Sequence, residues 1–269
     1  MSVPLRPVSD LLSVLELEPV KPDAFLGAGP DLGWGRLYGG QVVAQALRAA
    51  GLTVEARFLP HSLHAYFVRA GDEKQPVLYE VERVRDGRSF CTRQVVAYQA
   101  GGAILNLIAS FQVTEGGADV QPIAPPPGIP GPDELPPTPT DLFMDHRTAR
   151  ADDGSRIGTT TWVRVPQALG EDPTVHACAF AYLSDEDPLG VALLPHPTSG
   201  DWDALMAASL DHALWFHRPL RADSWLLVDL TGHGVANARG LALARVFDTA
   251  GRHVATVAQE GLVRPRRRD

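Results

Sequence analysis

The sequence has little of what marks several large classes of protein. Only two cysteines, Cys91 and Cys178, occur in 269 residues, which is too few for a disulfide framework or a cysteine-rich zinc site. No apolar run approaches the roughly 20 residues that a membrane-spanning helix needs. The formal net charge is -8, so no basic field attracts phosphates. We therefore expect no membrane and no nucleic acid as partners.

Targeting signals are also lacking. The apolar residues near the N-terminus are interrupted by Asp10, Glu16 and Glu18, a pattern that does not fit a secretory signal. The last three residues are not the Ser-Lys-Leu address of peroxisomal proteins. The basic run at residues 264–268 is interpreted as a solvated tail. A cytoplasmic location is the expectation.

Two motifs of enzyme chemistry are absent. No Gly-x-Ser-x-Gly elbow occurs, which argues against a serine hydrolase of the α/β type. The glycines of "GHGVANARG", residues 232–240, fail the dinucleotide pattern because Asn237 takes the place of the last glycine, and the segment lies between predicted strands. The sequence therefore predicts no cofactor, and it offers no set of converging metal ligands.

Proline is abundant in one place and divides the chain. Nine of the 20 residues at 121–140 are proline, and such a segment stays extended. We therefore predict an N-terminal domain at 20–115, a proline-rich linker at 116–158 and a C-terminal domain at 159–265.

Each half shows one helix followed by four strand-like runs. The first helix is predicted at 38–51 and stops at Gly51; the second begins after the N-cap Asp172 and runs to about Asp185. The predicted strands are 59–69, 76–85, 89–100 and 103–113, then 206–217, 224–231, 237–248 and 252–263. The segment "DTAGR", 248–252, is typical of a hairpin turn.

The two halves also match in residue spacing. Ser62 in "SLHAYFVR" precedes Gln112 by 50 residues, and Ser209 in "SLDHALWFHR" precedes Gln259 by 50 residues. A duplicated unit explains this spacing and the shared order of elements. Residues 177–183 are apolar all round, which is typical of a helix buried on every side. An α+β fold in which each antiparallel sheet curls around its helix satisfies both patterns.

Six motifs in order carry a resemblance to a known family. They are "YGGQVVAQAL", "HSLHAYFVRAGD", "VRDGRSFCTRQVVAYQ", "AYLSD", "SLDHALWFHRP" and "AQEGLVR". Together they resemble the type II acyl-CoA thioesterases, whose chains hold two fused hotdog domains, each a curled antiparallel sheet around a long central helix. The resemblance implies hydrolysis of an acyl-CoA substrate to a carboxylic acid and CoA, and association into a homodimer or homotetramer.

The same resemblance implies three catalytic residues. In the family a carboxylate, a hydroxyl and an amide hold the water that attacks the thioester, and the motifs assign these roles to Asp185, Ser209 and Gln259. A carboxylate can accept the proton of the water as general base. Because Asp185 follows the predicted helix at its negative pole, we expect its charged form to be destabilised and its pKa to be raised.

The first half lacks such a set. It offers Ser62, His64 and Gln112, but its helix ends as "ALRAAG" without an acid, so we expect a degenerate site there. Other polar residues lie close to Ser209 in "DHALWFHR", 211–218, and we expect structural roles for them, such as hydrogen bonds at strand ends or contacts between the two halves.

Two other functions stay open on the same fold. An enoyl-CoA hydratase would need a histidine beside Asp185, whereas the helical His176 lies nine residues earlier. A non-catalytic acyl-CoA binding protein would not need the complete set of acid, hydroxyl and amide. Both are therefore less favoured than a thioesterase.

Overall fold

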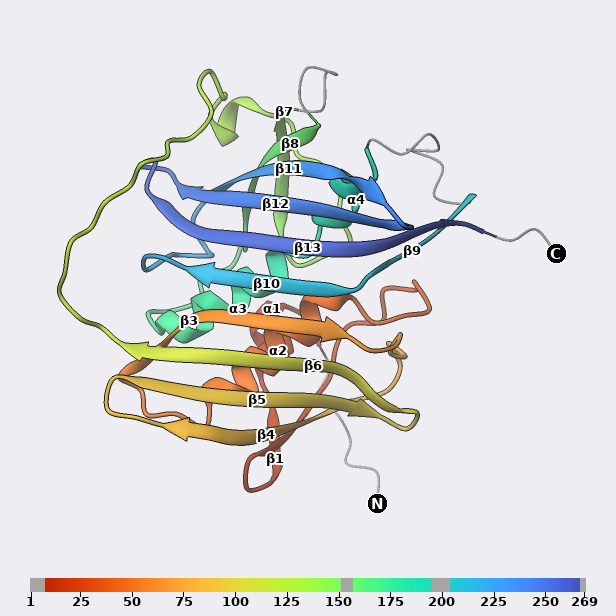
Figure 1. The fold of residues 1–269 in the computed structure, drawn as a ribbon, viewed down its shortest axis with the longest axis vertical. Coiled ribbons are helices and arrows are strands. Elements are labelled where there is room, and N and C mark those ends of the chain that lie inside the picture. The colour runs from red at the N-terminus through yellow and green to blue at the C-terminus, as the bar shows by residue number, and fades with distance from the viewer. Residues whose placement is uncertain (1–7, 151–156, 195–203, 267–269) are drawn as a thin grey trace. The chain divides into compact units, whose positions relative to one another are not determined.

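The computed structural model describes residues 8–150, 157–194 and 204–266 (Figure 1). The chain forms two compact units. Unit 1 contains the residues up to Ala118 together with Gln167–Tyr182. Unit 2 contains Asp119–Pro166 and the residues from Leu183 onward.

In each unit a helix precedes a run of consecutive strands. The helices are α1 (Leu11–Leu15), α2 (Gly39–Gly51), α3 (Pro173–Leu183) and α4 (Pro188–Leu193), with a 3-10 turn at Pro132–Glu134. The first strands are β1 (Glu18–Lys21), β2 (Ala24–Gly27), β3 (Phe58–Phe67), β4 (Val77–Asp86), β5 (Phe90–Gln99) and β6 (Gly102–Val113). The later strands are β7 (Asp145–Arg150), β8 (Gly158–Arg164), β9 (Leu205–Ser209), β10 (Asp211–Phe216), β11 (Leu226–Ala236), β12 (Arg239–Asp248) and β13 (His253–Pro265).

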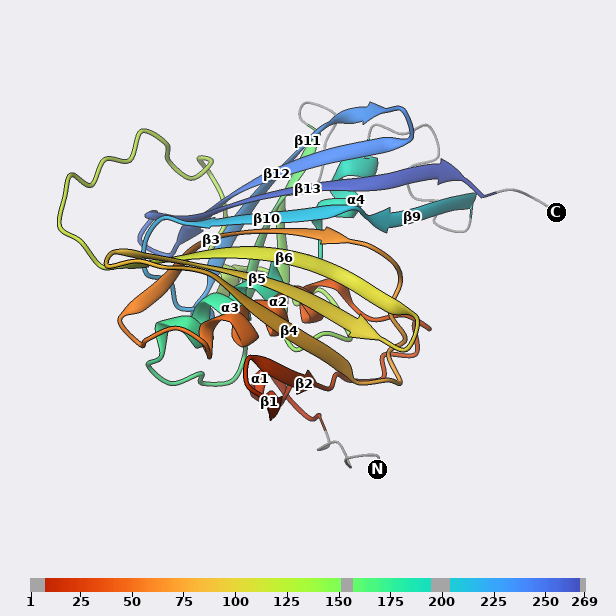
Figure 2. The same cartoon turned by 60° about the horizontal axis from the view of Figure 1, so that its bottom comes forward.

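Unit 1 is an antiparallel sheet with helices on one face. Its strands lie in the order β1, β2, β4, β5, β6, β3. Buried and partly exposed residues alternate along β5 from Cys91 to Tyr98, as expected of a strand with one covered face. Helix α2 packs on β4, β5 and β6, and α1 packs on α2 (Figure 2). The small residues of α2 keep it thin, so that the sheet approaches it closely.

Helix α3 runs antiparallel to α2 within unit 1. At its start, the Asp172 carboxylate lies 3.8 Å from the Arg48 guanidinium near the end of α2. At its end, the Tyr38 hydroxyl, which precedes α2, donates to the carbonyl oxygen of Tyr182 at 2.8 Å. The rings of Tyr38 and Tyr182 also meet edge to face, with centroids 5.0 Å apart. Both ends of the helix pair are therefore fixed.

Unit 2 is a second antiparallel sheet, and α4 packs against it. The strands lie in the order β10, β13, β12, β11, β8, β7, and β9 also pairs with β13. Helix α4 contacts β11, β12 and β13. A Cβ atom at Gly232 of β11 would lie 2.8 Å from the carbonyl oxygen of Val191, and one at Gly240 of β12 would lie 2.9 Å from that of Ala192. These glycines therefore let the helix backbone approach the sheet.

Most strands and both predicted helices lie where the sequence predicted them. The helix predicted after Asp172 is α3, whose residues up to Tyr182 group with unit 1. The sequence did not predict the short helix α4, which packs on β11–β13. The run predicted as one strand at 206–217 is divided into β9 and β10 at Leu210.

The segment predicted as a linker is also more structured than its composition suggested. Residues Asp145–Arg150 of this segment form β7, which pairs with β8. Its proline-rich part packs on an apolar cluster of unit 2 that contains Trp162, Trp225, Leu227 and Phe247. The indole Nε1 of Trp162 donates to the carbonyl oxygen of Pro130 at 2.9 Å. Proline kept the segment extended, and its apolar side chains still provided a surface for packing.

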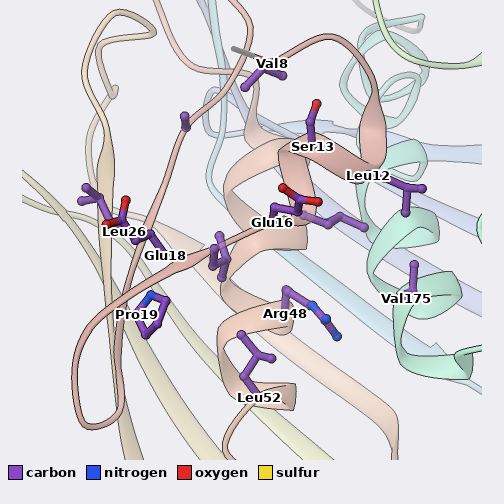
Figure 3. A pocket seen from close by; sticks show the side chains of 13 residues that line it. Val8, Leu12, Ser13, Glu16, Glu18, Pro19, Leu26, Arg48, Leu52 and Val175 are labelled. Atoms are coloured by element: carbon purple, nitrogen blue, oxygen red, sulfur yellow. The ribbon is translucent and has the colours of Figure 1, made fainter. Parts of the chain in front are cut away.

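Unit 1 contains a pocket of about 690 Å³ (Figure 3). Leu12 and Glu16 line it from α1 and the residues after it, Arg48 and Leu52 from the end of α2, and Val175 from α3. No helix within the described ranges is long and apolar enough to cross a membrane.

The close approach of α4 to β12 predicts a position-specific cost of a methyl group. Gly240→Ala should lower the free energy of unfolding by about 1–3 kcal/mol, because the added Cβ meets the backbone of α4. Urea unfolding followed by circular dichroism measures this change. Gly116→Ala is the matched control, since nothing lies within 4 Å of a Cβ there. Equal unfolding midpoints for the two variants would contradict the packing constraint.

Candidate active site

Asp185 lies in the turn between α3 and α4 of the chain. Helix α3 ends at Leu183, and α4 begins at Pro188 after the N-cap Asp187. Asp185 is 8% exposed and Ser184 is 6% exposed, so this turn buries two polar side chains. Both belong to unit 2. The acid therefore follows one helix and precedes another, where the sequence predicted only a helix end.

The neighbouring carboxylates have different surroundings. The Thr161 hydroxyl donates to Asp187 at 3.3 Å, and Nε2 of His146 lies 3.4 Å from the same carboxylate oxygen. Burial lowers the pKa of His146, but the hydrogen bond and charge of Asp187 outweigh burial and raise it overall. Burial, and then the charge of Asp187, raises the pKa of Glu186. Asp187 thus contacts side chains of β7 and β8, whereas Asp185 lies next to His212.

Ser209 and Gln259 come together across neighbouring strands. Ser209 is the last residue of β9 and lies opposite Gly261 of β13. Gln259, two residues earlier on β13, is 1% exposed, and its Nε2 donates to the Ser209 hydroxyl at 2.8 Å. The contact between these two predicted residues is direct.

A histidine links this pair to the turn that holds Asp185. His212 of β10 is fully buried. Its Nδ1 lies 2.5 Å from Oε1 of Gln259, and its Nε2 lies 2.9 Å from the Ser184 hydroxyl. The carboxylate oxygen Oδ1 of Asp185 lies 3.9 Å from the same Nδ1. The structure therefore places Asp185 beside the ring that contacts Gln259, which itself contacts Ser209.

Burial keeps the His212 ring neutral at physiological pH. Desolvation lowers its pKa to about 4, although the hydrogen bond to Gln259 acts in the opposite direction. A neutral imidazole carries one N–H and one bare nitrogen, so each of its two contacts has a fixed direction of donation. His212 is therefore suited to hold other groups in place.

Sequence reasoning missed the position of His212 for a geometric reason. On a continuous strand, Ser209 and His212 are separated by three positions and would face opposite sides of the sheet. The strand is broken at Leu210, and the register against β13 shifts by one residue across the break. Both side chains can therefore contact Gln259. The structure places the His212 ring beside Gln259 and Asp185, a position that the sequence did not predict.

The other polar residues of this segment make hydrogen bonds at strand ends, as predicted. The Asp211 carboxylate accepts from the backbone N–H of Glu260 at 2.9 Å. His217 contacts the Thr256 hydroxyl at 2.8 Å, and Arg218 pairs with Asp119. Within the described ranges, no three His, Cys, Asp or Glu side chains converge as metal ligands.

Ser62 and Gln112 of the first half are placed differently across their strands from Ser209 and Gln259. Ser62 of β3 lies opposite Ser110 of β6, and Gln112 lies opposite Leu59. The hydroxyl of Ser110 is instead bonded to Nε2 of His61 at 2.8 Å, and His64 is exposed. The first half therefore does not repeat the bonded serine and glutamine pair.

Comparison with known proteins identifies relatives over nearly the whole chain. Residues 30–112 match the family model of the acyl-CoA thioesterase N-terminal domain, and residues 118–263 match that of the C-terminal domain. Acyl-coenzyme A thioesterase 8 of Rattus norvegicus is 37% identical over 95% of this chain and 89% of its own length. Acyl-CoA thioesterase 2 of Haemophilus influenzae is 33% identical over 96% of this chain and 98% of its own.

Solved structures of related proteins have the same fold as this chain. The acyl-CoA thioesterase II TesB2 from Mycobacterium marinum superimposes with a TM-score of 0.81 at 37% identity, covering 95% of this chain and 97% of its own. The tesB protein of Mycobacterium avium subs paratuberculosis gives a TM-score of 0.84 at 31% identity, covering 95% and 98%. With a hotdog-fold structure from Alicyclobacillus acidocaldarius the TM-score is 0.78 at 19% identity. The chain has the hotdog fold and belongs to the type II acyl-CoA thioesterase family.

Proposed function

We propose that this protein hydrolyses acyl-CoA thioesters to a carboxylic acid and CoA by direct attack of a water molecule held by Asp185, Ser209 and Gln259. The observation that carries the proposal is the hydrogen bond between buried Gln259 and half-buried Ser209, a pair joined through His212 to the turn of Asp185. Family membership supplies the reaction, and this arrangement supplies the groups that the reaction needs.

In the proposed mechanism, the oxygen of the water molecule bonds to the thioester carbon, and the Asp185 carboxylate takes a proton from that water. The amide N–H of Gln259 stabilises the oxygen that becomes negative. When the tetrahedral intermediate collapses, the bond between carbon and sulfur breaks, and the proton returns from Asp185 to the sulfur of CoA. Atoms and charge balance with water as the only second reactant.

The hydrogen bonds favour a water nucleophile over a serine nucleophile. A catalytic serine needs a base that accepts the proton of its hydroxyl. The two ring nitrogens of His212 are bonded to Gln259 and Ser184, and Ser209 accepts its hydrogen bond from Gln259. Ser209 is thus placed to hold a water molecule.

The two alternatives predicted from the sequence are less well supported. A hydratase would need a histidine that exchanges protons with its substrate, whereas His212 is fully buried and His176 is bonded to the Gly170 carbonyl at 2.9 Å. A binding protein without activity would not need an acid, a hydroxyl and an amide together. Release of thiol from a panel of acyl-CoA chain lengths separates the three functions.

We also propose that the halves 20–115 and 159–265 are a degenerate and a catalytic hotdog domain. This proposal is supported by the two predicted helices, which are present as α2 and α3, and by the antiparallel sheet in each unit. Assembly into a homodimer or homotetramer and a cytoplasmic location stay predictions.

The role of Asp185 predicts opposite effects of two neighbouring substitutions. Asp185→Asn should lower kcat about 10²–10⁴-fold, because the general base is lost, while stability is kept or increased. Asp187→Asn should leave kcat within a few-fold and lower stability by about 1 kcal/mol, because it weakens the contacts to His146 and Thr161. Thiol release and urea unfolding of both variants measure these effects. Unchanged turnover in Asp185→Asn would overturn the mechanism.

The roles of Ser209 and Gln259 predict a second pattern. Gln259→Leu should lower kcat about 10²–10³-fold, because an N–H donor to the developing oxyanion is lost. Ser209→Ala should lower kcat because the hydroxyl that holds the water is lost. The proposed reaction forms no acyl-enzyme on this serine. Rapid-mixing kinetics should therefore show no burst of thiol in the native protein. A burst that disappears in Ser209→Ala would instead establish a covalent intermediate.

A further inference from the structure

The hydrogen bonds around His212 form one continuous row. The Ser184 hydroxyl contacts Nε2, Nδ1 contacts Oε1 of Gln259, and Nε2 of Gln259 contacts the Ser209 hydroxyl. Serine, amide and neutral imidazole can each donate and accept. Hydrogen bonds can therefore be donated along the row from Ser184 toward Ser209. They can also be donated from Ser209 toward Ser184, if the oxygen and nitrogen of the Gln259 amide exchange places.

Asp185 distinguishes the two directions. Its carboxylate oxygen lies 3.9 Å from Nδ1 of His212, so a proton on Nδ1 is attracted by the negative charge and a bare lone pair there is repelled. With the proton on Nδ1, the ring donates to Oε1 of Gln259, and the bare Nε2 accepts the proton of Ser184. The NH2 group of Gln259 then points to Ser209.

We propose that His212 is a positioning residue, held by Ser184 in the tautomer with its proton on Nδ1, that fixes the Gln259 amide with its NH2 group toward Ser209 and the reacting thioester. The catalytic consequence rests on the proposed hydrolysis, but the tautomer does not. Full burial of the ring supports a positioning role, because His212 is not exposed to a substrate.

The direction of this row decides what Gln259 contributes. In the assigned direction, one amide proton goes to Ser209 and the other is left to donate to the oxyanion, while the Ser209 proton is left to donate in turn. In the reverse direction, Gln259 would present its carbonyl oxygen and could not stabilise negative charge. Loss of one such donor lowers kcat about 10²–10³-fold in hydrolases.

Two variants that each keep a polar group at the place of one ring nitrogen distinguish a positioning role of His212 from a packing role. In His212→Asn the side-chain nitrogen has the same number of bonds from Cβ as Nδ1, so it can still donate to Gln259. In His212→Gln the terminal group takes the place of Nε2, and the contact to Gln259 is lost. His217→Asn, next to the end of β10 and bonded to Thr256, is the matched control.

We expect His212→Asn to keep kcat within about 10-fold of the native enzyme, and His212→Gln to lose about 10²–10³-fold with KM changed only a few-fold. Ser184→Ala should give an intermediate loss, because the tautomer is no longer held. His217→Asn should match the native kinetics. Equal losses in His212→Asn and His212→Gln would overturn the proposal, since packing alone would then explain them.

Nitrogen-15 NMR of the native protein tests the tautomer without any activity. The chain has nine histidines, and the signals absent from His212→Asn identify those of His212. At neutral pH we expect a proton on Nδ1 and a bare Nε2. A proton on Nε2, or on both nitrogens, would overturn this proposal even if the protein hydrolyses acyl-CoA. Failure of hydrolysis with Nδ1 protonated would instead count against the proposed function alone.

Discussion

The buried amide of Gln259 is the constraint on which the arrangement of the site depends. An amide has two donors and an acceptor, and burying it without partners costs a large fraction of the stability of a domain. Gln259 lies within β13, so its partners must come from the strands beside it. The break at Leu210 satisfies this requirement, because β9 supplies Ser209 and β10 supplies His212 to the same side chain. The irregularity in the sheet therefore brings both side chains to Gln259, and strand irregularities are common near active sites.

The position of Asp185 depends on packing at both ends of its turn. In unit 1, the Tyr38 hydroxyl donates to the carbonyl oxygen of Tyr182 near the end of α3. In unit 2, α4 lies against strands whose glycines admit its backbone. The acid thus follows the negative pole of one helix and precedes the positive pole of another. The two helix dipoles therefore have opposite effects on the stability of its negative charge. The carboxylate of Asp185 is also buried and lies beside the His212 ring.

The sequence predicted the regular elements well where local patterns determine them. The helix 39–51, the strands β3 to β6 and the turn at Asp248 follow from alternation and turn chemistry. The helices and strands that the sequence did not predict are α1, β1, β2, β7, β8 and α4, and each of them is short. Their structure depends on what they pack against. Pairing of β7 with β8, for example, fixes residues that composition alone describes as linker.

The candidate site was predictable in part for the same reason. Motif resemblance was sufficient to select Asp185, Ser209 and Gln259, because residue type and order are visible in a sequence. His212 could not be selected, since a one-residue change of register reverses the side to which a strand residue points. Ser184 could not be selected either, because its role exists only through the buried ring.

Equal spacing in the two halves does not give equal geometry. Both halves separate a serine from a glutamine by 50 residues, yet Gln259 lies two positions before the partner of Ser209, while Gln112 lies two positions after the partner of Ser62. Adding an acid after α2 would therefore not restore a site in the first half, because its amide and hydroxyl are not aligned. The difference between the halves lies in strand register as much as in the missing carboxylate, and register is set by the whole sheet.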